Sequence, residues 1–416
     1  MPSSATSLFR TAITALIAAP AFGPTMFGQA TSSPPPSYRF SSGDAALNIP
    51  LELVANGLVF VRAKVNDHPG WFILDNATQG FAVDRDFARE MKLETTGSGT
   101  ARGGGANTID VGVIRDVDID LPGFDLTHRN LAAIALKSLE PSLGHEVDGI
   151  IGSRLFDDFV VDVDYEHRLV SIYLPKQYKP SEKATVFPVR IDQHGFQFID
   201  ATIALSGVKP VTGNFLIDGG ANTYADIYKP FSDAHQIPPA TMKLLDEPGT
   251  STGGTTQSRE GRADRIEVGP YSVQSPPITF AQDTESLMAS QDYAGLVGAE
   301  VLERFTVVFD NPGKRIWLTP NRNYAEPAEH DESGLRIAAE GLGFHRFVVR
   351  RIVSGSPAAE AGIQPGDVIE SIDNSSAEEM TLTEMRSRLC QPKLHAIAIR
   401  RGDNHLQVSL RPRPLL

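Results

Sequence analysis

Two aspartates of this chain follow the same kind of apolar run. Asp75 follows Phe-Ile-Leu, and Asp218, 143 positions later, follows Phe-Leu-Ile. A carboxylate is seldom placed beside a buried apolar run without a partner, so we interpret each aspartate as the partner of the other. Two carboxyl groups in contact share one proton, because both cannot ionise at low cost. The ionised group can take a proton from water while the protonated group polarises a carbonyl, which suits amide hydrolysis.

The surroundings of the two aspartates repeat as well. Residues 149–152 read Gly-Ile-Ile-Gly, and residues 295–298 read Gly-Leu-Val-Gly, at an offset of 146. Each run is followed at matching positions by a Phe and an Asp, which are Phe159 and Asp164 in the first copy and Phe305 and Asp310 in the second. Such a repeat predicts two similar units that pack about a pseudo-twofold axis and bring the two aspartates together.

Further signals indicate that both units are built from strands. The runs at 58–65 and 196–205 alternate as half-buried strands do. Gly-rich segments at 97–107 and 249–254 follow the aspartates, and we interpret them as hairpin tips because they recur at matched positions. Either segment alone would be an ordinary surface loop.

These motifs resemble the two-lobed bacterial kind of retropepsin-like aspartyl protease with a C-terminal PDZ domain. The resemblance implies a mainly β fold, with two pseudo-twofold-related retropepsin-like (pepsin-type acid protease) β-barrel lobes followed by a small α+β PDZ domain. It implies no metal and no organic cofactor, and a site that forms within a monomer. The site residues that it implies are catalytic Asp75 and Asp218, with substrate-binding Asn76, Ala77, Gly219 and Gly220 in the turns that follow.

The two turns depart from the Asp-Thr/Ser-Gly pattern of that family. Asn76 and Gly219 lack the hydroxyl that braces the turns across the axis, and Ala77 brings a Cβ to a position where the family has Gly. We expect an aspartic-type endopeptidase that acts on peptides or unfolded proteins. The alternative is a catalytically weakened or inactive peptide-binding protein of the same fold.

The C-terminal residues 334–416 resemble a PDZ domain. Residues 341–344 read Gly-Leu-Gly-Phe and precede a strand pattern at 347–353, a Ser-Pro-Ala-Ala run and a Pro-Gly-Asp turn. The resemblance implies that the strand offers an open edge to a peptide, opposite a helix at 382–389. The residues that it implies for binding the peptide's terminal carboxylate are Gly341, Leu342, Gly343 and Phe344. The alternative is an intramolecular lid or a dimer contact that binds no free C-terminus.

The N-terminal residues 1–30 resemble a secretory signal. Arg10 precedes an apolar run at 11–22, and small residues end at Ala30. That run is about half the roughly 20 residues that a membrane span needs, so we expect export to the periplasm or the medium without a permanent anchor. Domains are predicted at 39–180 and 181–320 for the two lobes and at 334–416 for the PDZ domain, with linkers at 31–38 and 321–333.

Composition excludes several other function classes. Hydrophobic residues make up 41% of the 416 residues and charged residues 21%, which is typical of a soluble globular protein. The net charge of −13 disfavours nucleic acid as a partner. The single cysteine, Cys390, excludes an internal disulfide and sites with several thiolates. The ten histidines form no zinc-binding pattern, and no nucleophile elbow, P-loop or dinucleotide fingerprint is present.

Overall fold

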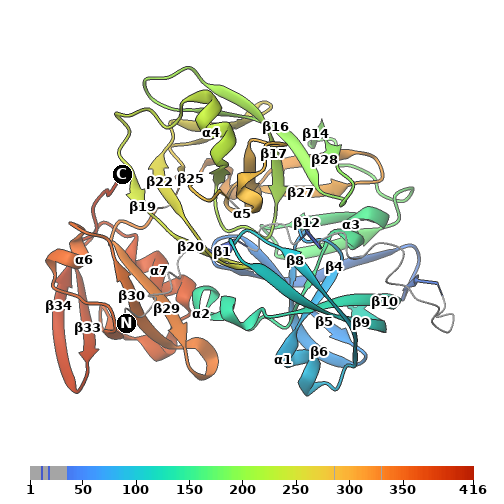
Figure 1. Cartoon of the computed structure of the whole chain (residues 1–416), viewed down its shortest axis with the longest axis horizontal. Coiled ribbons are helices and arrows are strands. Elements are labelled where there is room, and N and C mark those ends of the chain that lie inside the picture. Colours follow the sequence, from blue (N-terminus) through green and yellow to red (C-terminus); the bar gives the residue numbers. More distant parts are fainter. Residues whose placement is uncertain (1–10, 13–16, 19–34, 285, 329) are drawn as a thin grey trace.

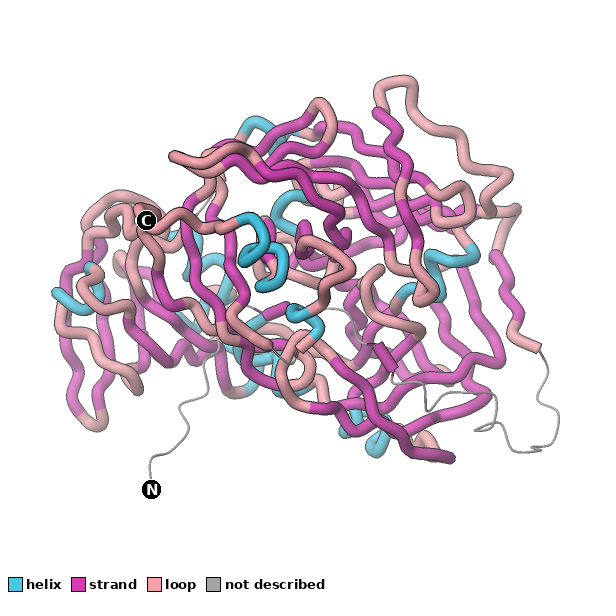
Figure 2. The backbone as a smooth tube through the Cα atoms, turned by 45° about the horizontal axis from the view of Figure 1, so that its top comes forward, coloured by secondary structure: helices cyan, strands magenta, loops and turns pink. Residues whose placement is uncertain are grey.

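The computed structural model describes residues 11–12, 17–18, 35–284, 286–328 and 330–416. The fold is mainly β, with large mixed sheets joined by short helices (Figures 1 and 2). We call residues 39–180 the first half and residues 181–320 the second half. In Figure 1 the C-terminal residues, in orange and red, form a separate sheet on the left. The predicted export signal and the first linker lie largely outside the described residues.

The first half consists of strands whose side chains alternate between the core and the surface. Strand β5 (Leu58–Val65) coincides with the predicted run, but its first four residues are all buried and only residues 62–65 alternate between exposed and buried. The other strands are β3 (Ser37–Phe40), β4 (Ala45–Val54), β6 (His68–Leu74), β7 (Phe81–Asp84), β8 (Thr95–Arg102), β9 (Thr108–Leu121), β10 (Phe124–Ile134), β11 (Gly149–Ile151), β12 (Val160–Asp164) and β13 (Leu169–Tyr173). The helices are α1 (Arg85–Glu90), α2 (Glu140–Leu143) and α3 (Ser153–Asp158).

The second half is also built mainly from strands, with a few short helices. Its strands are β14 (Thr185–Pro188), β15 (Arg190–Ile191), β16 (Gln197–Ala204), β17 (Val211–Asp218), β18 (Ala225–Ile227), β19 (Leu245–Asp246), β20 (Gly249–Ser251), β21 (Gly254–Thr256), β22 (Ser258–Arg262), β23 (Arg265–Val268), β24 (Tyr271–Gln274), β25 (Pro277–Ala281), β26 (Gly295–Gly298), β27 (Phe305–Asp310) and β28 (Arg315–Pro320). Its helices are α4 (Lys229–His235) and α5 (Ala299–Leu302).

The two Gly-x-x-Gly runs occupy equivalent places in the two halves. Strand β11 pairs in parallel with β6 and antiparallel with β7. Strand β26 likewise pairs in parallel with β17 and antiparallel with β18. A Cβ on Gly152 would lie 2.2 Å from the Gly80 carbonyl oxygen, and one on Gly298 would lie 2.4 Å from that of Thr223. The second glycine of each run therefore permits a close backbone approach to the turn that follows each aspartate.

Strands from the two halves join in one sheet. Its order includes β14-β28-β27-β12-β13-β4, and the halves meet where β12 pairs antiparallel with β27. Asp162 lies opposite Val308, and these two residues are equivalent in the repeat, at the offset of 146. Strands β12 and β27 are therefore paired so that equivalent residues of the two copies lie opposite each other at the centre of the pair.

The C-terminal sheet has its own apolar core. Its strands are β29 (Leu335–Glu340), β30 (Arg346–Ile352), β31 (Val368–Ile372), β32 (Ser375–Ser376), β33 (His395–Arg401) and β34 (Asn404–Leu410), with helices α6 (Pro357–Glu360) and α7 (Leu382–Leu389). Helix α7 has the predicted bounds and begins with a capping box between Thr381 and Glu384.

The open edge of this sheet differs from the prediction. Strand β30, which contains most of the predicted edge strand, pairs with β29 on one side and β31 on the other, so it has no open edge. Gly341 and Gly343 have φ values of +75° and +74°, and with Leu342 and Phe344 they form the turn between β29 and β30. The Leu342 side chain is fully exposed. The predicted edge strand is therefore corrected to β29, and the assignment of these four residues to carboxylate binding stays a prediction.

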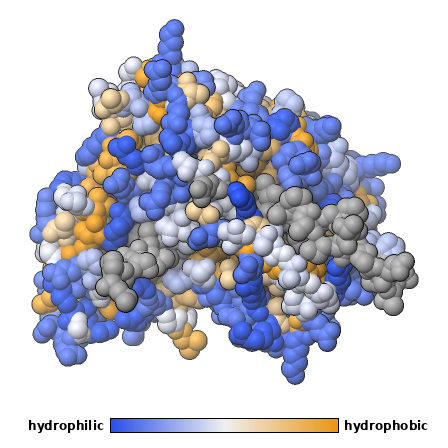
Figure 3. All heavy atoms as spheres, in the orientation of Figure 1, coloured by the Kyte–Doolittle hydropathy of each residue, from blue (hydrophilic) through white to orange (hydrophobic). Residues whose placement is uncertain are grey.

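The visible surface is mainly hydrophilic (Figure 3). Figure 3 shows hydrophilic side chains over most of the visible face, with apolar side chains in smaller groups. Among the described residues, no helix has both the length and the apolar character that crossing a membrane requires.

Candidate active site

Asp75 and Asp218 occupy equivalent turns at the ends of β6 and β17, and both are fully buried. The Ala77 N–H donates to Asp75 Oδ1 at 2.8 Å, and the Gly220 N–H donates to Asp218 Oδ1 at 2.9 Å. The Asp75 N–H donates to the Ile151 carbonyl at 3.0 Å, which ties the turn to β11. Each carboxylate is thus held by the backbone of its own turn.

The fold brings these two turns together. A Cβ on Gly220, which belongs to the Asp218 turn, would lie 2.4 Å from Asp75 Oδ2. The negative charge of Asp75 also raises the pKa of Asp218, after the larger effect of burial. The structure therefore places the two predicted catalytic residues in one site, and Gly220 has no side chain because Asp75 lies there.

Asn76 connects the two turns directly. Its Nδ2 donates to the Ile217 carbonyl at 2.7 Å, and its Oδ1 accepts from the Gly219 N–H at 2.9 Å. Asn76 is 2% exposed, so both bonds are shielded from water. One amide side chain thus braces the site from one side, and Gly219 takes part through its backbone. The hydroxyl groups that the motif lacks are replaced by this single bridge.

Ala77 fits its position although the related motif has Gly there. Its side chain is fully buried in a cluster that otherwise comes from the second half, with Phe196, Phe198 and Leu216 among its members. The Cβ thus packs across the interface between the halves, where it contributes apolar contact.

The electrostatic environment differs between the two carboxyl groups. Burial raises the pKa of Asp75 to about 6, against hydrogen bonds from Thr78 and Ala77 that lower it. The Thr78 hydroxyl donates to Asp75 Oδ2 at 2.7 Å, whereas Ala221, the matching residue of the second copy, has no hydroxyl. Asp218 Oδ2 has no hydrogen-bond partner among the described residues, and burial raises the pKa of Asp218 well above its usual range. Asp75 therefore ionises first, and Asp218 retains the proton.

Thr78 is a functional residue that the sequence reasoning missed. The available signal was a hydroxyl three residues after the aspartate in only one of two otherwise matched copies. That asymmetry is how two similar turns acquire different proton affinities.

The predicted hairpin tips approach each other in space. Residues 103–107 lie between β8 and β9, and residues 252–253 lie between β20 and β21. The Gly105 N–H donates to the Thr252 carbonyl at 3.1 Å, and the Asn107 N–H donates to the Gly253 carbonyl at 3.0 Å. The short strands β1 (Thr11–Ala12) and β2 (Ile17–Ala18) pair with β20 and β8, so the backbones of both hairpins accept an added strand.

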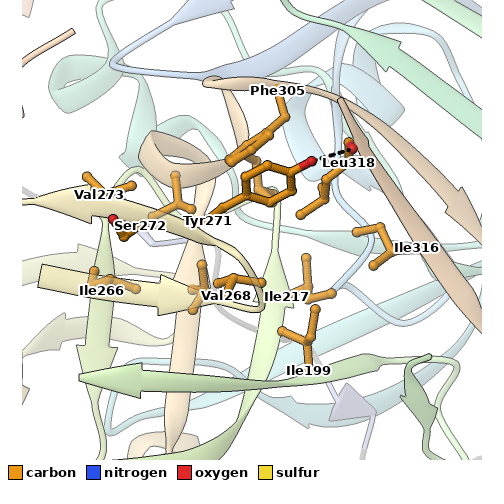
Figure 4. A pocket seen from close by; sticks show the side chains of 13 residues that line it. Ile199, Ile217, Ile266, Val268, Tyr271, Ser272, Val273, Phe305, Ile316 and Leu318 are labelled. Carbon is orange, nitrogen blue, oxygen red and sulfur yellow. Dashed lines mark hydrogen bonds between the residues drawn. The ribbon is translucent and has the colours of Figure 1, made fainter. Parts of the chain in front are cut away.

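A small apolar cavity of about 20 Å³ lies in the second half. Figure 4 shows Ile217, Phe305 and Tyr271 among the side chains that point into it, with the Tyr271 hydroxyl donating to the Leu318 carbonyl. No charged residue lines it, and its volume is close to that of one water probe. It is a packing gap in the core of the second half.

Replacing Gly220 with Ala tests the close approach of the two turns. The added Cβ would overlap Asp75 Oδ2, so the carboxylate must move, and a shift of about 1 Å can lower a rate roughly 10²-fold. The matched control is Ala77→Gly, which removes a Cβ at the equivalent position of the other turn and should change the rate far less. Equal rates for wild type and Gly220→Ala in a peptide cleavage assay would contradict the geometry.

Comparison with known proteins identifies two domains. Residues 61–155 match the aspartyl protease family, and residues 348–401 match the PDZ domain family. The chain is similar to human PDZ and LIM domain protein 3, with 37% identity over 76 residues, which is 18% of this chain and 20% of that protein. It therefore spans about a fifth of the length of this curated relative.

Two solved structures are similar over short segments. A photosystem II D1 C-terminal processing protease matches with 23% identity and a TM-score of 0.19, over 20% of this chain and 23% of the other. The HtrA3 PDZ domain bound to a phage-derived ligand (FGRWV) matches with 21% identity and a TM-score of 0.18, over 19% of this chain and 82% of the other. By the two family matches, the chain contains an aspartyl protease family domain and, towards its C-terminus, a PDZ domain.

Proposed function

We propose that this protein is an aspartic-type endopeptidase and that its two halves are the two lobes of a retropepsin-like fold, related by a pseudo-twofold axis. The observation that carries the proposal is the pair of buried aspartates on equivalent turns, bridged by Asn76. The symmetric register of β12 and β27 supports the arrangement of the lobes. The β-barrel description of each lobe belongs to the same proposal.

The unequal proton affinities assign a role to each carboxyl group. Asp75, ionised above about pH 6, takes a proton from a water molecule as that water attacks the peptide carbonyl carbon. Asp218, whose free Oδ2 carries the proton, donates a hydrogen bond to the carbonyl oxygen on which negative charge develops. Proton transfer to the amine then completes cleavage without a covalent intermediate.

The substrate class follows from the backbones of the hairpins. Strands β8 and β20 each pair with an added strand in this structure, and an extended peptide offers the same hydrogen-bonding groups. Peptides and unfolded proteins are therefore the proposed substrates. We also propose that the PDZ domain binds peptide C-termini along β29, and that the protein is exported, for which the sequence pattern of residues 1–30 is the support.

The test is the pH profile of cleavage of a reduced and alkylated protein, with fragments identified by mass spectrometry. Activity should increase as the pH rises through about 6, because Asp75 must be ionised. Thr78→Val removes a hydrogen bond that stabilises the ionised form, so its profile should move to higher pH. No fragments at any pH, with peptide binding retained, would favour the alternative of a non-catalytic peptide-binding protein.

A further inference from the structure

The groove of the PDZ domain lies between β29 and α7. Strand β29 is the edge of its sheet, and peptides bind PDZ domains by adding a strand to an exposed edge. Helix α7 flanks this edge, because a guanidinium nitrogen of Arg386 on α7 donates to the Ile337 carbonyl of β29 at 3.2 Å. The peptide site of this domain is therefore defined by β29 and α7.

A segment of the first half is inserted at this edge. It consists of residues 140–144, which are α2 and its cap Gly144, and we call it the plug segment. The Arg386 guanidinium also donates to the Ser142 carbonyl at 3.0 Å. A Cβ on Gly144 would lie 2.6 Å from Leu382 Cβ on α7 and 3.4 Å from Ala339 Cβ on β29. Figure 1 shows α2 beside β29 and α7.

Residues of both halves lie beside the rest of the groove. A cavity of about 570 Å³ is lined by Leu335 and Ile337 of β29, by Arg386 and Cys390 of the α7 region, and by carboxylates of the second half. Glu247 of the second half accepts hydrogen bonds from Arg336 at 2.7 and 2.8 Å. The groove thus has room for a ligand, while the plug segment contacts β29 and α7 beside it.

We propose that the plug segment and the C-terminus of a peptide compete for the PDZ groove, so that the domain binds a peptide only after it separates from the plug segment. The inference rests on the proposed peptide-binding role of the PDZ domain. Arg386 bonds to two carbonyl oxygens through one nitrogen, and a carboxylate would be a stronger partner for it. Burial and the charge of Arg336 lower the pKa of Arg386 to about 10, which agrees with an incompletely compensated cation.

The plug segment is also connected to the catalytic turn. Four residues separate Gly144 from β11, and the Ile151 carbonyl of β11 accepts the Asp75 N–H. Leu139 and Leu143 pack in one cluster with Ile150 of β11 and Ile73 of β6. Release of the plug segment would therefore disturb the strand that supports Asp75, so peptide binding in the PDZ groove and peptide binding beside Asp75 are linked reciprocally.

The first measurement uses Cys390, which is partly buried and lines this cavity. Gly144→Val in the full chain would force Leu382 and Ala339 away, so N-ethylmaleimide should alkylate Cys390 about tenfold faster or more than in wild type. Gly43→Val is the matched control, because Gly43 has a similar φ, +61° against +67°, but open space around its Cβ position. Arg386→Met, which removes the bonds to Ser142 and Ile337, is a second variant if Gly144→Val does not fold.

The second measurement is capture of peptides from a synthetic pool of random pentapeptides with free C-termini, with the same pool amidated as the control. Gly144→Val, which keeps Arg386 for the peptide carboxylate, should capture peptides from the free pool, whereas wild type and Gly43→Val should capture far fewer. The proposed competition would be overturned if Cys390 of Gly144→Val and of Arg386→Met were alkylated at the wild-type rate. It would also be overturned if wild type captured as much peptide as Gly144→Val. If Cys390 were alkylated faster in the variants but no variant captured peptide, the competition would also be overturned. That result would show that the plug segment does cover the groove but that the PDZ domain does not bind peptide C-termini.

Discussion

Asp75→Asn and Asp218→Asn should each lower peptide cleavage on the order of 10³-fold, and Asp75→Asn should also make the protein more stable at neutral pH. An amide can neither take a proton from water nor donate one in the way a carboxyl group does, so either change removes one member of the pair. The amide is also neutral at every pH, whereas the ionised form of Asp75 is disfavoured by its burial. Activity and stability should therefore move in opposite directions.

The pH dependence of the stability follows from the raised pKa of Asp75. Because the pKa is 3.8 in the reference state and about 6 in the folded state, the protonated carboxyl group favours folding below about pH 4. That contribution is lost as the pH rises through about 6, and above it the difference is on the order of 3 kcal/mol. Asp75→Asn should match wild type near pH 4 and unfold at a higher temperature at pH 7 to 8.

Asp162→Asn is the matched control for both measurements. Burial raises the pKa of Asp162 to about 6 as well, but Asp162 lies in β12 and outside the two catalytic turns. Its replacement should give a similar stabilisation above pH 6 and leave cleavage close to wild type. If Asp75→Asn retained cleavage while its stability increased, Asp75 would be a buried structural carboxylate and the proposed mechanism would be wrong.

Asn76→Ala should have the second largest effect, on stability and on cleavage together. The change leaves the Ile217 carbonyl and the Gly219 N–H buried without their partner. Each unsatisfied group costs about 1–3 kcal/mol, so the free energy of unfolding should fall by about 2–6 kcal/mol. Because both groups belong to the Asp218 turn, the geometry of the two carboxyl groups should loosen and cleavage should slow markedly at a temperature where the variant is folded.

Asn311→Ala separates these two effects. Asn311 is buried like Asn76, donates to the Gly195 carbonyl at 3.1 Å and accepts from the Gln197 side chain, but it does not bridge the catalytic turns. It should lower stability by a similar amount without slowing cleavage by the folded fraction. Chemical denaturation and initial rates measured on the same preparations would check both variants, and equal losses of rate would argue against a special role for Asn76.

Local sequence patterns predicted the elements that depend on local chemistry. The run at 58–65 became β5, and the capped helix at 382–389 became α7, because alternation and capping act within a few residues. The Gly-x-x-Gly runs were found by their recurrence, and their strands, β11 and β26, occupy matching places beside β6 and β17. The repeat also led to Asp75 and Asp218 before any geometry was known.

The remaining features depend on contacts between distant segments. The bridge made by Asn76 requires the Asp218 turn to lie within hydrogen-bond distance, which no pattern near residue 76 encodes. The Gly-Leu-Gly-Phe run gave the wrong edge strand, because a glycine-rich turn that closes a hairpin has the same local sequence as a loop that binds a carboxylate. The plug segment was not predicted, because its contacts with α7 and β29 join residues almost 200 positions apart or more.

The sheet shared by β12 and β27 has a thermodynamic consequence. Strand β27 has β12 as its neighbour on one side, so loss of either half leaves the other with an unpaired strand and an exposed apolar face. Unfolding of one half therefore lowers the free energy of unfolding of the other half. We expect the two halves to unfold together as one cooperative unit. Each copy of the repeat is a unit of sequence and of topology, but neither copy is a unit of stability.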